Sequence, residues 1–416
     1  MAIEGLNLDE QGTRVRRAGR ALARLSEAEV NDILTDLARE TEQGIPALQA
    51  ANAQDLRMMD PADPRYDRMQ LNEARLRDIA DDLRHVASLP SPLGRVLSET
   101  TRPNGLRLRR VSVPFGVIGI IFEARPNVCF DCFALCLKAG SACILKGGSD
   151  AAESCRAIAG LIHRVLQRHG LPAEAAMLLT THEATDWLLK ARGTVELIIP
   201  RGSQRLIDYV RRNARVPVIE TGAGVVHTYI DSQADLEKAT AIVLNAKTRR
   251  VSVCNALDCL ILHASRLGDL PLICAPLLQK GVMIEADERA FRQLAPNAQV
   301  VQAGADSFGT EFLALRMAVR TVDSLDEALA HIRRFGSGHS ESIVTEDEEA
   351  ARRFQQEVDA ACVYWNAPTS FTDGAQFGLG AEIGISTQKL HARGPMALEE
   401  LTTYKWLIEG EGQTRP

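Results

Sequence analysis

The sequence predicts an α/β protein built on a doubly wound parallel sheet, and three features support this prediction. Residues 117–122 form an uninterrupted apolar run, which is typical of a strand buried on both faces. Residues 128–138 and 151–167 show helical periodicity, and a short apolar segment at 142–146 separates them. Because strands that alternate with helices favour a parallel sheet, ligands are expected at the carboxyl ends of the strands.

The chain before this region is expected to be helical. Ser26 and Glu29 have the spacing of a capping box, which favours the start of a helix. Further on, six apolar residues recur at helical intervals, and the face they form is expected to pack on the sheet. These residues are Leu76, Ile79, Ala80, Leu83, Val86 and Ala87.

A hairpin is expected around Asn104-Gly105, because this dipeptide is a strong turn signal and alternating side chains follow it. The pattern leaves two readings open, a hairpin that pairs with another subunit and a solvated edge hairpin. Short apolar strands are expected at 177–179 and 195–199. A second unit is expected after about residue 229, and residues 401–408 predict a final strand.

Composition excludes several classes of protein. A net charge of -6 provides no basic field that would attract nucleic acid or an anionic membrane. The first residues are acidic and lack the apolar core of a signal peptide, and no run approaches the roughly 18 apolar residues of a membrane span. The number of cysteines is odd, nine, which argues against a complete disulfide framework. We therefore expect a cytoplasmic protein whose cysteines are reduced.

Cys254 is the candidate nucleophile. Lys247, Arg249 and Arg250 lie just upstream, and cationic neighbours favour the reactive thiolate. The alternative is that Cys254 is a small buried apolar residue, which is the commonest fate of a lone cysteine. Local sequence alone does not decide between the two.

No metal site is expected. Cys132 and Cys136 stand four residues apart in a helical segment, but no histidine or acidic residue completes a ligand set at suitable spacing. We interpret both cysteines as core residues.

Two polar residues follow apolar strand patterns. Asn127 lies between a strand and a helix, where its amide could stabilise a developing oxyanion or simply cap the helix. Glu220 precedes a glycine turn and could be a general base or a solvated turn carboxylate.

Taken together, these residues resemble the aldehyde dehydrogenase superfamily. Asn127 follows one predicted strand, and Lys146 follows the next. Glu220 precedes a glycine turn, and Cys254 lies 34 residues further on. No G-x-G-x-x-G follows a strand, and members of this superfamily bind NAD(P) without that fingerprint. The resemblance implies a Rossmann-type cofactor domain, an α/β catalytic domain and an oligomerisation hairpin.

The implied domains can be placed on the sequence. An NADP-binding domain would comprise residues 1–95 and 114–224, and the catalytic domain residues 225–384. The oligomerisation hairpin and tail would comprise residues 96–113 and 385–416.

The resemblance also assigns catalytic roles. Cys254 would be the nucleophile, and Asn127 would form the oxyanion hole with the backbone N–H of Cys254. Glu220 matches the base that activates water in oxidative relatives. If the reaction involves no water, Glu220 would instead tune the thiol or order its surroundings.

Cofactor residues follow from the same resemblance, which implies NADPH. Lys146 would contact the adenosine ribose, and Ser149, Gly202 and Ser203 would line the phosphates or the adenine. Glu311 would hold the nicotinamide ribose.

Many ordered segments from about residue 90 onward resemble one branch of the superfamily, in which an acyl phosphate is reduced. Examples are GVIGIIFEARPNV, FGSGHSESIVTED and KLHARGPMALEELTTYKW. This implies reduction of L-glutamyl 5-phosphate through a cysteine thioester, releasing phosphate and L-glutamate 5-semialdehyde in the second step of proline synthesis from glutamate. A homo-oligomer and contact with glutamate 5-kinase are further implications.

Some positions depart from that branch, and two other functions compete. The branch usually has Pro at Val251, and Ser and Arg at Pro368 and Ser370. An oxidative aldehyde dehydrogenase would hydrolyse its thioester with water and would not depend on phosphate. A non-catalytic scaffold that binds the cofactor would show no selective alkylation of Cys254.

Overall fold

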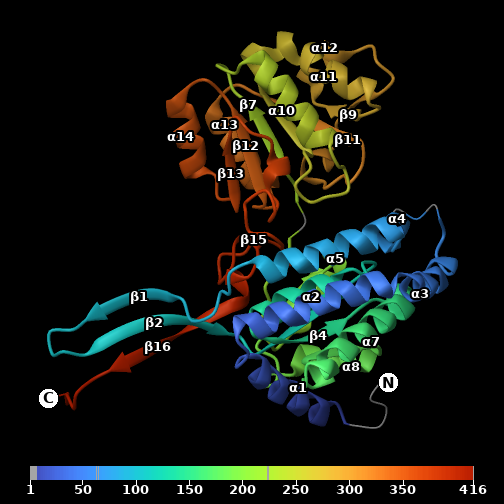
Figure 1. Ribbon diagram of the computed structural model, residues 1–416. Helices are drawn as coiled ribbons and strands as arrows, with labels where there is room; N and C mark the ends of the chain where they lie inside the picture. Colours follow the sequence, from blue (N-terminus) through green and yellow to red (C-terminus); the bar gives the residue numbers. More distant parts are fainter. Residues whose placement is uncertain (1–6, 62, 64, 223, 416) are drawn as a thin grey trace. The chain divides into compact units, whose positions relative to one another are not determined.

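The computed structural model describes residues 7–61, 63, 65–222 and 224–415, and the chain folds into two compact units (Figure 1). The first unit spans residues 1–221, 378–384 and 396–416, and the second spans 222–377 and 385–395.

These units differ from the predicted ranges in three places. The boundary falls after residue 221 rather than 224, and residues 378–384 group with the first unit instead of the catalytic domain. Residues 385–395, predicted as part of the tail, group with the second unit. The chain crosses between the units again after residues 377, 384 and 395, and periodicity along a sequence does not report such crossings.

Helices form the start of the first unit, as predicted. The Ser26 hydroxyl accepts from the backbone N–H of Glu29, and the Glu29 carboxylate accepts from the backbone N–H of Ser26, so the capping box is present. The predicted apolar stripe lies on α5 and is buried, but it packs against α2 and α6 rather than on the sheet itself. The helices are α1 (Leu8–Leu22), α2 (Glu27–Gln43), α3 (Ile45–Arg57), α4 (Tyr66–Met69) and α5 (Glu73–Ser88).

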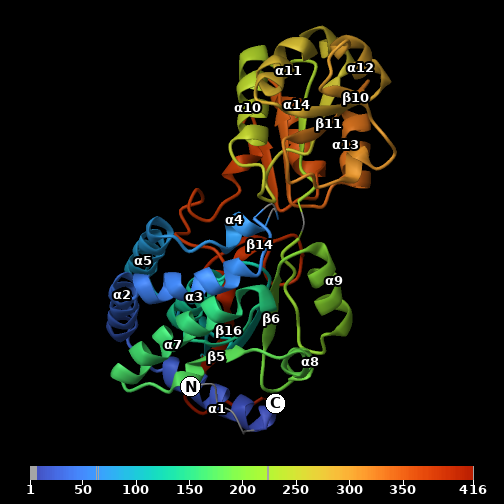
Figure 2. The ribbon, with the colours of Figure 1, turned by 90° about the vertical axis from the view of Figure 1, so that its right-hand side faces the viewer.

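A parallel four-stranded sheet of order β5-β4-β3-β6 forms the centre of the first unit. Figure 2 shows α7 with α2 and α3 on one side of it, and α8 and α9 on the other. The strands are β3 (Val117–Phe122), β4 (Ala142–Lys146), β5 (Ala176–Leu179) and β6 (Leu197–Arg201). The helices are α6 (Val128–Lys138), α7 (Ala152–Arg168), α8 (His182–Lys190) and α9 (Gln204–Asn213), with 3₁₀ turns at Ser149–Ala151 and Ala173–Ala175.

The strand order places a switch point between β3 and β6. The chain moves outward from β3 to β4 and β5, and then returns to place β6 on the other side of β3. In doubly wound sheets, ligands bind beyond the carboxyl ends of the strands at such a point.

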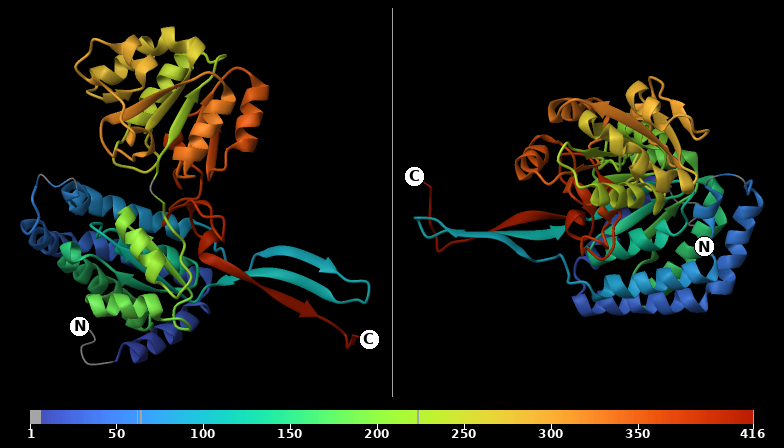
Figure 3. Two further views of the ribbon diagram at one scale, coloured as in Figure 1. Left: turned by 180° about the vertical axis from the view of Figure 1, so that it is seen from behind. Right: turned by 90° about the horizontal axis from the view of Figure 1, so that it is seen from above.

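A separate antiparallel sheet carries the predicted hairpin. Its strands are β1 (Val96–Thr101), β2 (Arg107–Pro114) and β16 (Thr402–Glu409), in the order β1-β2-β16. Gly105 has a φ of 88°, which a glycine adopts without strain, so the turn forms where Asn104-Gly105 predicted it. Figure 3 shows this sheet extending away from the remainder of the first unit.

The second unit is built on a seven-stranded parallel sheet of order β10-β9-β11-β8-β7-β12-β13. The strands are β7 (His227–Ile230), β8 (Cys259–His263), β9 (Met283–Ala286), β10 (Val300–Gln302), β11 (Arg316–Val322), β12 (Ser340–Val344) and β13 (Cys362–Trp365). The helices are α10 (Leu236–Thr248), α11 (Leu270–Gln279), α12 (Glu288–Leu294), α13 (Leu325–Phe335) and α14 (Glu348–Glu357).

Two apolar cores show that this sheet too is covered on both faces. One core contains residues of α10, α11 and α12, and the other contains residues of α13 and α14 (Figure 1). Smaller elements complete the chain. These are a two-stranded sheet of β14 (Gly384–Ser386) and β15 (Gly394–Met396), and 3₁₀ turns at Ala264–Asp269, Ser307–Gly309, Thr369–Phe371 and Glu399–Leu401.

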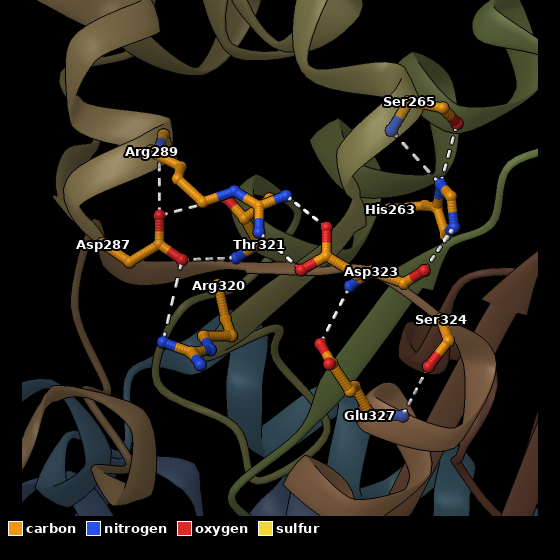
Figure 4. Close-up of polar contacts among 10 residues, drawn as sticks. His263, Ser265, Asp287, Arg289, Arg320, Thr321, Asp323, Ser324 and Glu327 are labelled. Carbon is orange, nitrogen blue, oxygen red and sulfur yellow. Dashed lines mark hydrogen bonds and ion pairs between the residues drawn. The ribbon is translucent and has the colours of Figure 1, made fainter.

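Capping contacts occupy the carboxyl ends of β8, β9 and β11 (Figure 4). Asp287 caps α12, and its other oxygen accepts from the backbone N–H of Thr321 at 2.6 Å. Asp323 forms two hydrogen bonds of 2.7 Å with Arg289, and Ser324 caps α13. These polar groups at the carboxyl edge of the sheet therefore satisfy one another.

None of the helices in the described part of the chain combines the length and apolar character that a membrane span needs.

Candidate active site

The eight residues predicted for the site are divided between the units. Cys254 and Glu311 belong to the second unit. The other six belong to the first unit, namely Asn127, Lys146, Ser149, Gly202, Ser203 and Glu220.

Cys254 lies in the loop between α10 and β8, at the amino end of β8. It is partly exposed, whereas the other eight cysteines are buried. The second unit therefore presents its thiol at the amino edge of the sheet, not at the carboxyl edge where the sequence led us to expect ligands. Exposure removes the alternative that Cys254 is a buried apolar core residue.

Gly224 holds the backbone close to Cys254. A Cβ at this position would lie 1.7 Å from the carbonyl oxygen of Cys254, so no larger residue fits without movement of the backbone. The backbone N–H of Gly224 donates to Glu311 Oε1 at 3.1 Å. Cys254 and Glu311 thus both lie next to the Gly224 segment.

The group in contact with the thiol is His339, a residue that the sequence analysis did not single out. Its Nε2 lies 3.2 Å from Cys254 Sγ. His339 is fully buried, and this burial lowers its pKa to about 4, which keeps the imidazole neutral at pH 7. The sequence signal that could have pointed to His339 is its position after Gly336-Ser337-Gly338 and directly before a buried strand.

Of the three cations just upstream of Cys254 in the sequence, two are exposed and one is buried. Arg249 and Arg250 are exposed. Lys247 is buried, donates to the carbonyl oxygen of Leu257 at 2.8 Å and lies 3.9 Å from Asp258. Burial lowers the pKa of Lys247 to about 8. Lys247 is therefore held by Leu257 and Asp258, and activation of Cys254 by Arg249 and Arg250 stays a prediction.

A chain of hydroxyl groups continues from the far side of His339. Its Nδ1 lies 2.8 Å from Ser340 Oγ, which lies 2.7 Å from Thr372 Oγ1. The hydroxyl of Tyr364 lies 2.7 Å from the same Thr372 oxygen. These groups hold the imidazole ring in a fixed orientation.

The segment around Thr372 contains one of the unusual positions noted in the sequence. Ser370 is buried, and its hydroxyl donates to Asn245 Oδ1 at 2.6 Å. The amide of Asn255, next to the nucleophile, donates to the carbonyl oxygen of Thr372 at 2.9 Å. Ser370 therefore fastens this segment to α10, and Asn255 joins it to the loop that carries Cys254.

In the first unit, Asn127 lies between β3 and α6, at the carboxyl edge of the sheet. Its side chain makes no capping hydrogen bond with α6, which removes the alternative of a simple helix cap. Instead, Nδ2 donates to Asp131 Oδ2 at 2.9 Å. Burial raises the pKa of Asp131 to about 6, an effect that Arg201 partly offsets.

Lys146 and Ser149 lie at the end of β4 and just beyond it. Lys146 is buried, and its Nζ donates to the carbonyl oxygen of Gly147 at 2.7 Å. Burial lowers the pKa of Lys146. Ser149 begins the 3₁₀ turn that leads into α7, and the neighbouring Asp150 has a buried Oδ1 with no hydrogen-bond partner among the described residues. These polar groups, including the unsatisfied Asp150 oxygen, fit the sugar and phosphate groups of a dinucleotide.

Gly202 and Ser203 lie just beyond β6, across the switch point from β3. Ser203 caps α9, and both its N–H and its hydroxyl donate to Glu123 Oε2 at 2.9 Å. A Cβ on Gly202 would lie 2.5 Å from the same Glu123 oxygen, which leaves room only for glycine unless that side chain moves. The amino end of α9 is a position where phosphate groups bind well.

Glu220 follows a short extended segment, not the apolar strand that the sequence predicted. Only an isolated bridge links Val218 with Ile198 on β6. A carboxylate oxygen of Glu220 lies 3.8 Å from Arg211 on α9. Glu220 and Arg211 thus form a partly buried ion pair.

A buried cluster in the second unit offers ligands of the type that zinc prefers. The ligand atoms of His227, Cys259 and His331 lie within 4.8 Å of one another, and His227 Nδ1 lies 3.0 Å from Glu341 Oε2. Tetrahedral zinc sets its ligands about 3.3–3.8 Å apart, as its bond lengths require. The cluster would therefore have to contract to hold an ion.

The second unit carries a partly exposed thiol, and the first carries a parallel sheet of a kind that binds dinucleotides. Sequence comparison defines the class of protein to which these features belong. The profile of the aldehyde dehydrogenase family matches residues 22–275. The chain belongs to the aldehyde dehydrogenase family, and the fold predicted from the resemblance is confirmed.

Within that family the chain is similar to gamma-glutamyl phosphate reductases. It is 58% identical to the enzyme of Parabacteroides distasonis over 99% of this chain and 100% of the relative. It is 59% identical to that of Chlorobium luteolum over 98% of each chain. The crystal structure of the Thermotoga maritima enzyme is 40% identical, with a TM-score of 0.94 over 98% of this chain and 100% of that one.

Membership of the family establishes the general chemistry. The chain is an oxidoreductase that uses a nicotinamide dinucleotide and acts on a small molecule.

Proposed function

We propose that this enzyme reduces L-glutamyl 5-phosphate to L-glutamate 5-semialdehyde and phosphate, with NADPH as the reductant. The observation that carries the proposal is full-length identity of 58% to gamma-glutamyl phosphate reductases. The partly exposed thiol of Cys254 supports it, because an acyl phosphate is a good electrophile for a cysteine nucleophile.

Cys254 would form a covalent intermediate. Its sulfur attacks the γ-carbonyl carbon, the bond from that carbon to the phosphate oxygen breaks, and a thioester remains on the enzyme. A nicotinamide dinucleotide held by the residues proposed below would supply the hydride that reduces the thioester carbon. The carbon–sulfur bond then breaks, which releases the aldehyde and restores the cysteine.

Asn127 is proposed as an oxyanion donor. An amide N–H directed at the carbonyl oxygen would stabilise the negative charge that develops there during attack. Because Asn127 Nδ2 donates to Asp131 in this structure, the amide would exchange that partner for the substrate oxygen. Water has no productive role in this reaction, so Glu220 is assigned an ordering role rather than that of a hydrolytic base.

The proposed cofactor residues are Lys146 for the adenosine ribose, Ser149, Gly202 and Ser203 for the phosphates or adenine, and Glu311 for the nicotinamide ribose. The positions of Lys146 and Ser149 at the end of β4, and of Gly202 and Ser203 just after β6, support the first four. Preference for NADPH over NADH is proposed from the family resemblance and is tested by comparing kcat/KM for both.

Three further proposals concern the setting of the enzyme. Its eight buried cysteines and its nucleophile suit the reducing cytoplasm. The β1-β2-β16 sheet is proposed to join subunits of a homo-oligomer. Contact with glutamate 5-kinase is proposed because an acyl phosphate is short-lived in water.

Dependence on phosphate tests the proposed reaction. In the reverse direction, oxidation of L-glutamate 5-semialdehyde with NADP should require inorganic phosphate, because phosphate must release the acyl group from Cys254. Oxidation at full rate without phosphate would show an oxidative aldehyde dehydrogenase that hydrolyses its thioester.

Two cysteine variants separate the nucleophile from the other thiols. Cys254→Ser should abolish turnover and leave cofactor binding intact. Cys274→Ala, which removes a buried thiol on α11, is the matched control and should retain activity. Turnover by Cys254→Ser would refute the covalent scheme.

A further inference from the structure

We infer that His339 is the general base and acid of the Cys254 reaction, taking the thiol proton as the sulfur attacks and passing it to the departing phosphate. The inference deepens the proposed function and rests on it. It assigns a catalytic residue from the distance of 3.2 Å between His339 Nε2 and Cys254 Sγ.

The fold brings together the two loops that carry Cys254 and His339. Cys254 lies at the amino end of β8, and His339 directly precedes β12. In the sheet, β7 lies between β8 and β12, so the two loops emerge at the same edge and flank one strand. Gly338 has a φ of 74°, and this turn sets the direction in which the chain enters β12.

The hydroxyl chain behind the ring selects the required tautomer. To accept a proton from the thiol, Nε2 must carry a lone pair, and Nδ1 must therefore carry the hydrogen. Ser340 Oγ, at 2.8 Å, is placed to accept that hydrogen and can donate its own to Thr372, 2.7 Å away. Tyr364 is linked to the same threonine oxygen at 2.7 Å, so the chain of hydroxyl groups continues to Tyr364.

The surroundings of His339 keep its imidazole neutral before the reaction. Burial of His339 disfavours the imidazolium ion, and no charged side chain in the described part of the chain contributes to this shift. Cys254 lies directly against His339, whereas Tyr364 is linked to it through Ser340 and Thr372 and is itself hydrogen-bonded to Cys362. Burial raises the pKa of Tyr364, which therefore stays neutral. The imidazole thus meets the thiol as a neutral acceptor.

Protons balance over the cycle. The thiol proton moves to Nε2 while the carbon–sulfur bond forms, and it then moves to the phosphate oxygen as the carbon–oxygen bond breaks. After hydride reduction, the sulfur leaves as a thiolate, and a proton from solvent restores the thiol through the same imidazole. Each turnover therefore consumes one hydride and one proton.

His339→Gln tests the inference. The glutamine amide can keep a hydrogen bond to the sulfur, but it cannot exchange a proton at neutral pH. General acid–base groups typically contribute about 10²–10⁴-fold, so kcat should fall by that order. Alkylation of Cys254 by iodoacetamide at pH 7, followed by peptide mass spectrometry, should slow at least tenfold, by roughly the lower part of the same range.

Raising the pH separates base catalysis from damage to the fold. An ordinary cysteine thiol, with a pKa of about 8.5, is mostly ionised at pH 9.5 without a base. The variant and the wild-type enzyme should therefore be alkylated at similar rates at this pH. Alkylation of the variant at pH 7 within twofold of wild type would overturn the inference. Equal slowing at both pH values would also overturn it, because it would indicate lost access or packing.

A second variant covers the case in which His339→Gln does not fold. Ser340→Ala removes the group that fixes the tautomer and leaves the imidazole in place. Its alkylation at pH 7 should slow about threefold to tenfold, a modest part of the general acid–base effect, with recovery at pH 9.5. An unchanged rate would overturn the proposed relay. Activity retained by Cys254→Ser would instead refute the proposed function itself, so the two failures are distinguishable.

Discussion

At the scale of single residues, the reactivity of Cys254 depends on a partner 85 positions away in sequence. The sequence identified the nucleophile through its resemblance to a family, but local charge pointed to Arg249 and Arg250, which are exposed. The contact with His339 forms only when the loops before β8 and β12 reach the same sheet edge. Local sequence carries no signal for such a pair.

Asn127→Ala provides a test of the oxyanion role. Loss of one oxyanion donor typically costs about 10²–10³ in rate, so kcat should fall by that factor while KM for the cofactor changes little. Steady-state kinetics check this, with Asn213→Ala, an exposed amide on α9, as the matched control. A loss below tenfold would contradict the assignment.

Asp131 predicts a pH dependence of stability. Its pKa is raised to about 6 in the folded chain, above the ordinary value of 3.8, so the folded state favours the protonated form. The stability that Asp131 contributes to the folded state is fully present below pH 3.8 and is lost as pH rises through 6. The shift sets an upper limit of about 3 kcal/mol, which partial exposure reduces.

Urea unfolding of Asp131→Asn measures this effect. Asparagine has no charge to bury, so the variant should gain stability relative to wild type between pH 4.5 and 7.5. A difference in unfolding free energy that stays constant over this range would contradict the raised pKa.

At the scale of elements, the proposed site residues lie at opposite edges of the two sheets. Asn127, Lys146 and Gly202 follow strands of the first unit, whereas Cys254 and His339 precede strands of the second. Periodicity predicted β3, β4 and α6 with their observed bounds, because uninterrupted burial and helical repeats leave clear patterns. It could not predict which sheet edge would carry the chemistry.

Gly224→Ala tests the close approach of this segment to the nucleophile. The added Cβ would lie 1.7 Å from the carbonyl oxygen of Cys254, so the loop must move. We expect a loss of at least tenfold in kcat, since small displacements of reacting groups are costly. Gly160→Ala, on an open face of α7, is the control and should be neutral. Unchanged kinetics in Gly224→Ala would show that the loop tolerates the shift.

At the scale of the whole molecule, the β1-β2-β16 sheet exposes large apolar side chains. Three large side chains of β16 are exposed, Tyr404 by 52%, Trp406 by 50% and Ile408 by 62%. Both outer strands, β1 and β16, also present unpaired edges of a kind that favours association. The sequence predicted the hairpin turn, but its pattern did not distinguish a subunit contact from a solvated edge.

Charge substitution on this sheet should separate the subunits. The double variant Trp406→Lys with Ile408→Lys should shift the enzyme toward the monomer in light scattering after size exclusion, because charge in an apolar interface is unfavourable. Met58→Lys, at an apolar residue that is 90% exposed outside this sheet, should have no effect. An unchanged mass for the double variant would support a solvated hairpin.

The account depends most on an acyl group held by Cys254. Peptide mass spectrometry can detect it after the enzyme is mixed with L-glutamyl 5-phosphate, generated in place by glutamate 5-kinase, in the absence of NADPH. We predict one glutamyl adduct on the peptide that contains Cys254, which disappears when NADPH is added. No adduct, or an adduct that persists with NADPH, would contradict the thioester mechanism.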